Sequence, residues 1–273
     1  MTTENPSFPP EFAPYLDEIL ATAKPSVCFT LQAGPAELWD SKVGGNPYLP
    51  DGMEYPKNSE GRPLALLAQI NFAQMPSLPG YPADGILQFY LDGNDDLMGM
   101  DFDNPCGQNG FRVLYHPEIQ TEGLQRHFPA HEGEDCILPF PLGSEYRILF
   151  QPAAAQYMTL EDHRFADSLP SLNRFLEEAA EKDGYDWSLH EKYEQVANGS
   201  THRIGGYPYF TQYDPREGGL AEYELLFQLD SEWGDEGGID VMWGDAGVGG
   251  FFIRPEDLKK RDFSQVAYNW DCC

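Results

Sequence analysis

The segment from Glu232 to Gly247 is the part of this 273-residue chain that is richest in side chains able to bind a ligand. It combines carboxylates with two tryptophans and five glycines, which permit tight turns. Trp243 beside Asp240 or Asp245 could hold a cationic or sugar-like ligand, with the ring as a platform and the carboxylate as the charge. The same pattern also predicts two tight turns around a strand whose Trp243 fills the core, and both interpretations stay open.

Gln69 and Gln228 lie among apolar residues in predicted strands. A buried glutamine must satisfy its amide and its carbonyl, so it commonly ties its strand to a neighbouring backbone. Alternatively, the two side chains face each other and line a polar pocket. We therefore take five residues as candidate ligand-binding residues: Gln69, Gln228, Trp243, Asp240 and Asp245.

No pattern predicts catalysis, a metal ion or a cofactor. The chain has no CxxC pair and no GxSxG motif. With 45 acidic residues, a carboxylate pair suited to hydrolysis can always be found and carries no information. The loop from Asp92 to Asn104 is rich in oxygen ligands but lacks the spacing of a calcium loop, so whether it binds a cation stays open. We expect no catalytic residue, no metal and no cofactor.

The charge balance narrows the class of partner. Seventeen basic against 45 acidic residues give a formal net charge of −28, which repels phosphate backbones and anionic lipid headgroups. We therefore expect no nucleic acid and no membrane as partners, whereas a basic protein surface is compatible. The chain has no apolar run of transmembrane length and no secretory signal, and its five scattered cysteines form no disulfide framework. These features predict a cytoplasmic protein.

The sequence segments that position these residues resemble two copies of one unit. The string from Gly44 to Tyr48 returns from Gly205 to Tyr209, and Leu66 to Asn71 returns as Leu225 to Asp230. Two further pairs of similar segments follow in the same order. The difference in residue number between matching positions falls from 161 to 138 along the chain. A duplication followed by loop trimming leaves this pattern. The largest trimming, 15 residues, falls where the first copy carries its acidic loop.

Periodicity predicts an amphipathic helix over 11–23 and two helices in the connector. Short strands bounded by glycine or proline are predicted over 26–32, 64–72, 86–91, 111–115, 145–150, 223–229, 239–243, 250–254 and 264–270. The predicted fold class is α+β and strand-dominated, with a duplicated antiparallel β unit packed around a pseudo-two-fold axis and peripheral helices. We expect one globular body over 1–273, with a first repeat over 25–150, a helical connector over 160–199 and a second repeat over 200–271.

The motifs resemble a known family. Lys42 to Gly45 with Pro47, Ala68 to Asn71, and Gly85 to Phe89 are similar to the first half of the YwqG-like bacterial family, a domain of unknown function. The run from Met242 to Gly247 is similar to its second half, and the resemblance covers about residues 25–271. The GGxP opening and the duplicated unit more distantly resemble the eukaryotic programmed-cell-death-two proteins. That resemblance implies a binding module for a basic protein client, although this chain lacks their paired cysteines.

These observations lead to two hypotheses from different classes. The first is a non-enzymatic cytoplasmic binding protein, chaperone-like or toxin-neutralising, whose acidic and aromatic surface between the repeats engages a basic protein. The alternative is a small-ligand-binding protein or hydrolase that uses Trp243, Asp245, Gln69 and Gln228 in a cleft between the repeats.

Overall fold

The computed structural model describes residues 8–129, 136–182, 186–234 and 238–273, and most of its strands form one antiparallel sheet. Part of the predicted glycine-rich turn, 235–237, lies outside the described residues. In the order β13-β12-β9-β8-β1-β6-β2-β3-β4-β5, neighbouring strands are hydrogen-bonded, and β7 pairs with β1. The strands are β1 (Lys24–Ala33), β2 (Lys42–Gly44), β3 (Ala65–Asn71), β4 (Ile86–Leu91), β5 (Phe111–His116), β6 (Glu145–Phe150), β7 (Ala154–Gln156), β8 (Arg203–Gly205), β9 (Glu224–Asp230), β12 (Val248–Ile253) and β13 (Ala267–Asp271).

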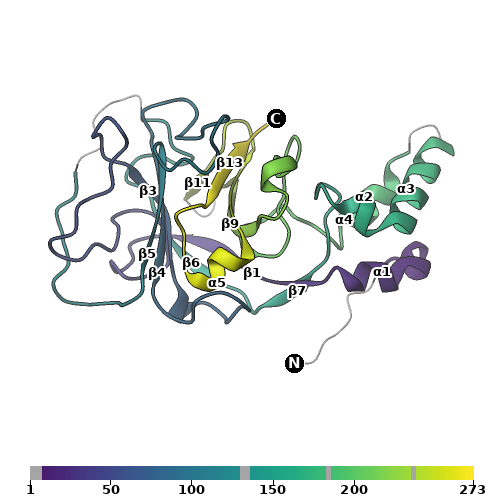
Figure 1. Cartoon of the computed structure of the whole chain (residues 1–273), viewed down its shortest axis with the longest axis horizontal. Helices are drawn as coiled ribbons and strands as arrows, with labels where there is room; N and C mark the ends of the chain where they lie inside the picture. Colours follow the sequence, from purple (N-terminus) through teal and green to yellow (C-terminus); the bar gives the residue numbers. More distant parts are fainter. Residues whose placement is uncertain (1–7, 130–135, 183–185, 235–237) are drawn as a thin grey trace.

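The sheet curls until its two ends face each other. The rings of Phe89 on β4 and Phe251 on β12 lie 4.7 Å apart between centroids, and Phe111 on β5 lies 5.3 Å from Tyr268 on β13. Phe227 on β9 stacks on Phe89 at 4.7 Å. Strands at opposite ends of the hydrogen-bonded order thus share one aromatic core, and the result is a barrel-like, strand-dominated α+β fold (Figure 1).

The strand order is symmetric about the central pair β1 and β6. Outward from this pair come β8, β9, β12 and β13 on one side, and β2, β3, β4 and β5 on the other. The registers match as well: Cys28 on β1 pairs with Arg203 on β8, as Arg147 on β6 pairs with Lys42 on β2. β1 itself pairs with strands of both halves, because its first residues meet β7 and β8 and its last residues meet β6.

The N-terminal helix and the helices of the connector gather at one end of the molecule, around a core of their own (Figure 1). The predicted helix over 11–23 is a 3-10 helix, η1 (Pro10–Tyr15), that continues into α1 (Leu16–Ala21). Pro14 lies inside η1 and has no N–H to donate, which explains why a regular α-helix begins only after it. The connector forms α2 (Phe165–Ser168), α3 (Pro170–Lys182) and α4 (Ser188–Glu194), while α5 (Pro255–Lys260), η2 (Phe72–Gln74) and η3 (Gly218–Leu220) lie on loops of the sheet. A separate hairpin pairs β10 (Glu232–Gly234) with β11 (Ile239–Val241).

Candidate functional site

Gln69 is fully buried on β3 and uses its whole amide in hydrogen bonds. Its Oε1 accepts from the backbone N–H of Tyr48 at 2.9 Å, and its Nε2 donates to the carbonyls of Leu38 and Asp40, both at 2.7 Å. The side chain thereby ties two loop segments to the middle of the strand.

Gln228 on β9 makes the same three contacts in the second half. Its Oε1 accepts from the N–H of Tyr209 at 2.9 Å, and its Nε2 donates to the carbonyls of Gly199 and Thr201, both at 2.8 Å. This side chain is also fully buried. Because both N–H groups of each amide are engaged by backbone, the geometry gives the two glutamines the tying role.

The other three candidates divide between core and surface. Trp243 is fully buried and packs beside Trp270, with 6.1 Å between ring centroids. Asp240 on β11 and Asp245 in the turn before β12 have exposed side chains. The backbone of Asp240 is held by Tyr146, whose hydroxyl oxygen accepts from the Asp240 N–H at 3.2 Å. With its ring enclosed, Trp243 offers no face on which a ligand could stack.

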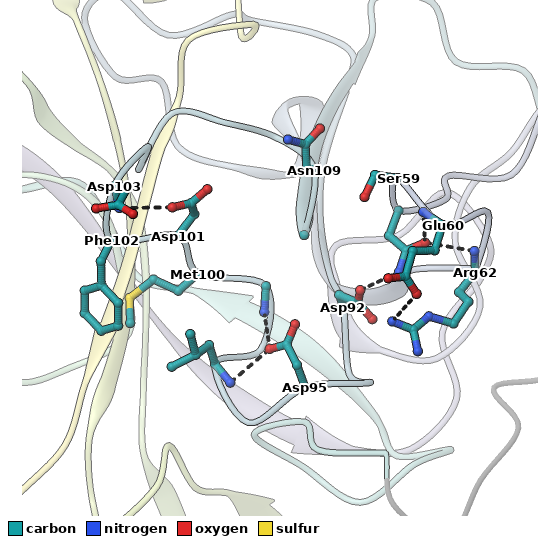
Figure 2. A pocket seen from close by; sticks show the side chains of 14 residues that line it. Ser59, Glu60, Arg62, Asp92, Asp95, Met100, Asp101, Phe102, Asp103 and Asn109 are labelled. Atoms are coloured by element: carbon teal, nitrogen blue, oxygen red, sulfur yellow. Dashed lines mark hydrogen bonds and ion pairs between the residues drawn. The ribbon is translucent and has the colours of Figure 1, made fainter.

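None of these five residues lines the cleft beside the acidic loop of the first half. That cleft has a volume of about 460 Å³ and lies along the loop between β4 and β5, which is the acidic loop of the first half. Figure 2 shows its side chains, several of which are carboxylates. The lining residues that matter for its charge are Glu60, Arg62, Asp92, Asp95, Asp101 and Asp103.

Short loop contacts shape the acidic wall. The Oδ1 of Asp95 accepts from the N–H of Leu97 at 2.9 Å, and the Oδ1 of Asp101 accepts from the N–H groups of Asp103 and Asn104 at 3.0 and 3.1 Å (Figure 2). Aspartate favours such turns because its short side chain reaches the backbone two residues on. These hydrogen bonds fix the backbone of the loop, while the side chains of Asp95, Asp101 and Asp103 remain exposed.

The carboxylates of the cleft have unequal roles. Asp92 is 3% exposed, and its oxygens accept from the side-chain amide of Asn58 at 2.6 Å and from the N–H of Asn94 at 3.0 Å. It therefore supports the loop. Glu60 pairs with Arg62 at 3.0 Å, which partly neutralises one side of the cleft (Figure 2). The unneutralised negative charge lies on the opposite side, around Asp101.

A second hollow of about 200 Å³ adjoins the cleft and is walled by both halves of the chain. It shares Leu97, Met100 and Phe102 with the cleft, and its far wall includes Tyr213 and Trp270. Phe102 is 72% exposed and Tyr213 is 70% exposed. We call these two rings, with the exposed carboxylates beside Phe102, the acidic–aromatic edge.

The acidic loop is fastened to the edge strand β13. The indole N–H of Trp270 donates to the carbonyl of Leu97 at 2.8 Å, and the N–H of Tyr268 donates to the carbonyl of Pro105 at 3.0 Å. The side-chain amide of Gln108 donates to the carbonyl of Phe263 at 2.7 Å. The loop therefore bridges the two ends of the curled sheet, and the acidic–aromatic edge lies on the seam between the halves.

One cluster of metal-ligating type lies elsewhere in the described residues, formed by Asp162, His163 and Asp214. Its carboxylates are already engaged by the fully buried Arg216, which lies 2.8 Å from Asp162 and 2.6 Å from Asp214. The guanidinium groups of Arg164 and Arg216 hold the pKa of Asp162 well below its usual range, against the opposing effect of burial. The cluster is a buried ion-pair network, and its oxygens are occupied by arginine N–H groups.

Fold and site together define a barrel-like, strand-dominated α+β protein with an acidic cleft and an aromatic edge on the seam between its halves. The chain belongs to the family described as Domain of unknown function (DUF1963), whose model matches residues 41–272. No curated protein matches the sequence. Within the described residues, every helix is too short or too polar to cross a membrane.

Proposed function

We propose that this protein is a non-enzymatic binding protein that engages a basic protein segment through the acidic–aromatic edge, in a chaperone-like or toxin-neutralising role. The observation that carries the proposal is the position of Phe102. Its ring is 72% exposed, and its chain neighbours Asp101 and Asp103 are exposed carboxylates that face the cleft (Figure 2). An exposed ring between two negative charges fits the amphipathic side chains of lysine and arginine.

Lysine and arginine have apolar stems and cationic heads, so they gain from a carboxylate and an aromatic face at the same place. The formal charge of −28 adds a long-range attraction that accelerates encounter with a basic partner. The exposed Tyr213 across the adjoining hollow extends the aromatic surface onto the second half. A segment bound there would touch both halves of the chain.

The geometry gives less support to the alternative, a small-ligand-binding protein or hydrolase. That hypothesis uses Trp243, Gln69 and Gln228, which are enclosed, and both glutamine amides are engaged by backbone. Asp240 and Asp245 are exposed but stand outside the acidic cleft.

We also infer that the two halves arose by duplication, which supports a binding surface at their seam. Beyond the glutamine ties, Lys42 donates to the carbonyl of Glu37 at 3.1 Å, as Arg203 donates to that of Asn198 at 2.9 Å. In each pair the donor follows the acceptor by five residues in the chain. The two donors, Lys42 and Arg203, are the first residues of the matching strands β2 and β8. The symmetric strand order also supports a duplication.

The narrower resemblances, to the YwqG-like family and the programmed-cell-death-two proteins, remain predictions, as does the cytoplasmic location. All five cysteines are free, which fits a reducing compartment. A shared ancestry with client-binding proteins would favour a protein partner over a small ligand.

Fluorescence anisotropy with a labelled peptide of alternating arginine and serine tests the proposed function. We expect binding at about 50 mM salt that weakens strongly at about 200 mM, because exposed charges are screened beyond about 10 Å. The double variant Asp101→Asn/Asp103→Asn should weaken binding by about two- to thirty-fold, since each exposed pair contributes about 0.2–1 kcal/mol. Phe102→Ala should weaken it by about two- to five-fold.

The matched control is Glu178→Gln/Glu181→Gln on α3, which removes the same two charges from an exposed face at the other end of the molecule. Its effect should be smaller than that of the Asp101/Asp103 variant. If both double variants lose the same affinity for the peptide, the peptide is attracted only by the net charge of the protein, and the proposed site is wrong. A peptide in which glutamate replaces arginine should not bind.

A further inference from the structure

The strand β5 is an edge of the sheet, because in the described part of the chain it pairs with β4 alone. In an antiparallel pair, successive residues direct their backbone N–H and C=O groups alternately toward the partner strand and away from it. The N–H of Val113 donates to the side chain of Gln108 at 2.8 Å, so Val113 faces away from β4, and by alternation Tyr115 does too. The N–H of Tyr115 has no hydrogen-bond partner among the described residues. The open side of β5 therefore carries unused backbone groups.

The other edge of the sheet is covered by a loop. The acidic loop runs along β13, where the N–H of Tyr268 donates to the carbonyl of Pro105 at 3.0 Å and the indole N–H of Trp270 donates to that of Leu97 at 2.8 Å. The loop in the symmetric position of the second half, 254–266 between β12 and β13, makes no backbone–backbone hydrogen bond with β5 among the residues that the structure describes. One edge strand is thus covered by backbone, and the other is open.

A single side chain occupies part of this open edge. The Oε1 of Gln108 accepts from the N–H of Val113 at 2.8 Å, and its Nε2 donates to the carbonyl of Phe263 at 2.7 Å. A side-chain amide carries the same kinds of donor and acceptor as a peptide group. Gln108 therefore makes the two hydrogen bonds that one peptide group of an added strand would make between β5 and the segment beside it.

A hollow of about 460 Å³ lies along the open edge, between β5 and the segment that follows α5. Of the described residues that line it, only Arg112 and Arg261 are charged. The guanidinium of Arg112 donates to the backbone carbonyls of Gln108 and Lys57 at 3.2 and 3.4 Å, and Arg261 is exposed. In a chain with 45 acidic and 17 basic residues, this hollow is a positively charged place that suits a segment bearing carboxylates.

The net charge of the protein opposes an acidic segment at long range, whereas the two arginines attract it at contact. The formal charge of −28 repels the segment before it arrives. At about 150 mM salt the Debye length is about 8 Å, so most of this repulsion is screened while attraction at contact distance is screened less. An acidic segment should therefore bind better at about 150 mM salt than at about 20 mM salt. A basic peptide at the acidic–aromatic edge has the opposite salt dependence.

We propose that the hollow beside β5 binds an extended acidic segment of another protein, which joins the sheet as a further strand and takes the place of the Gln108 amide. Residues opposite Val113 and Tyr115 project from the same face as these two side chains, where the Tyr115 ring lies 5.4 Å from that of Phe263. That face favours apolar residues. The residues between them project from the face of Arg112, which favours glutamate or aspartate. The partner segment therefore alternates apolar and acidic residues, and its binding does not depend on the function proposed for the acidic–aromatic edge.

The first test is fluorescence anisotropy at about 150 mM salt with a labelled peptide of alternating valine and glutamate. In the proposed register the valine N–H groups donate to the carbonyls of Val113 and Tyr115, and the glutamate N–H groups point away from β5. N-methylation of the valine amides should therefore weaken binding by about 5- to 150-fold, the effect of two lost hydrogen bonds. N-methylation of the glutamate amides changes the peptide chemically to the same extent and should weaken binding far less.

Two variants of the protein connect binding to the hollow. Gln108→Ala removes the competing amide, so it should strengthen binding of the valine–glutamate peptide by about 2- to 10-fold. Arg261→Gly removes a charge and should weaken binding by about 1.5- to 5-fold. This variant should fold at least as well as the original chain, because Arg261 has a φ of 59°, which glycine adopts without strain. Arg174→Gln, at an exposed position on α3, is the matched control for the lost positive charge and should have a smaller effect.

Three results would overturn the proposal. The first is an unmodified peptide that does not bind, and the second is an equal loss from the two N-methylated peptides, which would show that no strand forms on β5. The third is a protein that is dimeric in light scattering and stays dimeric with the peptide, which would show that the edge pairs with a second copy of the chain. Stronger binding by Gln108→Ala together with the N-methylation pattern would support the proposal.

Discussion

The replacement of Gln228 by methionine tests the tying role of the buried glutamines. Methionine has nearly the same length and volume, so the core stays filled, but the amide is lost. Three backbone groups lose their partner at once: the buried carbonyl of Gly199, and the partly buried N–H of Tyr209 and carbonyl of Thr201. At about 1–3 kcal/mol for an unsatisfied buried group, and less for the two groups that water can reach, the free energy of unfolding should fall by about 2–4 kcal/mol.

That loss is large against the total stability of a domain, which is about 5–15 kcal/mol. Urea unfolding followed by tryptophan fluorescence measures it, with an unchanged slope against denaturant as the sign of an unchanged folded state. Gln69→Met should lose at least as much, because Gln69 makes the three matching contacts and its Oε1 also accepts from Nε2 of Gln88 at 3.0 Å. Gln265→Met, at an exposed position, is the matched control and should change stability by less than about 0.5 kcal/mol. A loss below about 1 kcal/mol in both buried variants would refute the tying role. The two glutamines would then be explained as side chains that line a polar pocket.

Two further predictions concern the core. Burial lowers the pKa of His116 from its ordinary 6.5 to about 4. Between these pH values the imidazole is therefore protonated in the unfolded chain and neutral in the folded chain. The free energy of unfolding should therefore decrease by up to about 3 kcal/mol as the pH falls from 7 to 4, and His116→Asn should flatten this part of the pH profile in urea unfolding. A Cβ atom at Gly249 would overlap the enclosed Trp243 ring, so Gly249→Ala should cost about 1–3 kcal/mol and lower the Tm, whereas Gly219→Ala, with open space around it, should leave the Tm unchanged or slightly raised. Equal melting temperatures for the two alanine variants would contradict the packing described for Trp243.

The strands could be predicted where local pattern decides them. β4 and β6 begin and end at the predicted residues, because each is an unbroken run of strand formers between turn residues. β2 and β8 were not predicted, since three residues that end in a glycine show no periodicity. Both strands exist because their neighbours in the sheet supply the hydrogen bonds, which is information outside the local sequence.

The candidate site was predicted only in part. The sequence draws attention to the acidic loop as the main difference between the copies, and the cleft lies there. Phe102 and Tyr213 were missed, because a single aromatic residue in a polar loop has no pattern around it. Their exposure depends on how the loop meets β13, through contacts such as that of Trp270 with Leu97, which are more than 170 residues apart. The one local signal was Phe102 itself, an apolar side chain between two aspartates.

The shared strand β1 has a consequence for how the protein is made. β1 leaves the ribosome early, but Cys28 pairs with Arg203, which is synthesised 175 residues later. At about 5–20 residues per second, one edge of β1 waits roughly 9–35 s for its partner. During that interval the nascent chain exposes an unpaired strand edge, the kind of surface through which chains aggregate. The strands from β1 to β5 can pair with one another before that, but the sheet can close only after β13 has been synthesised.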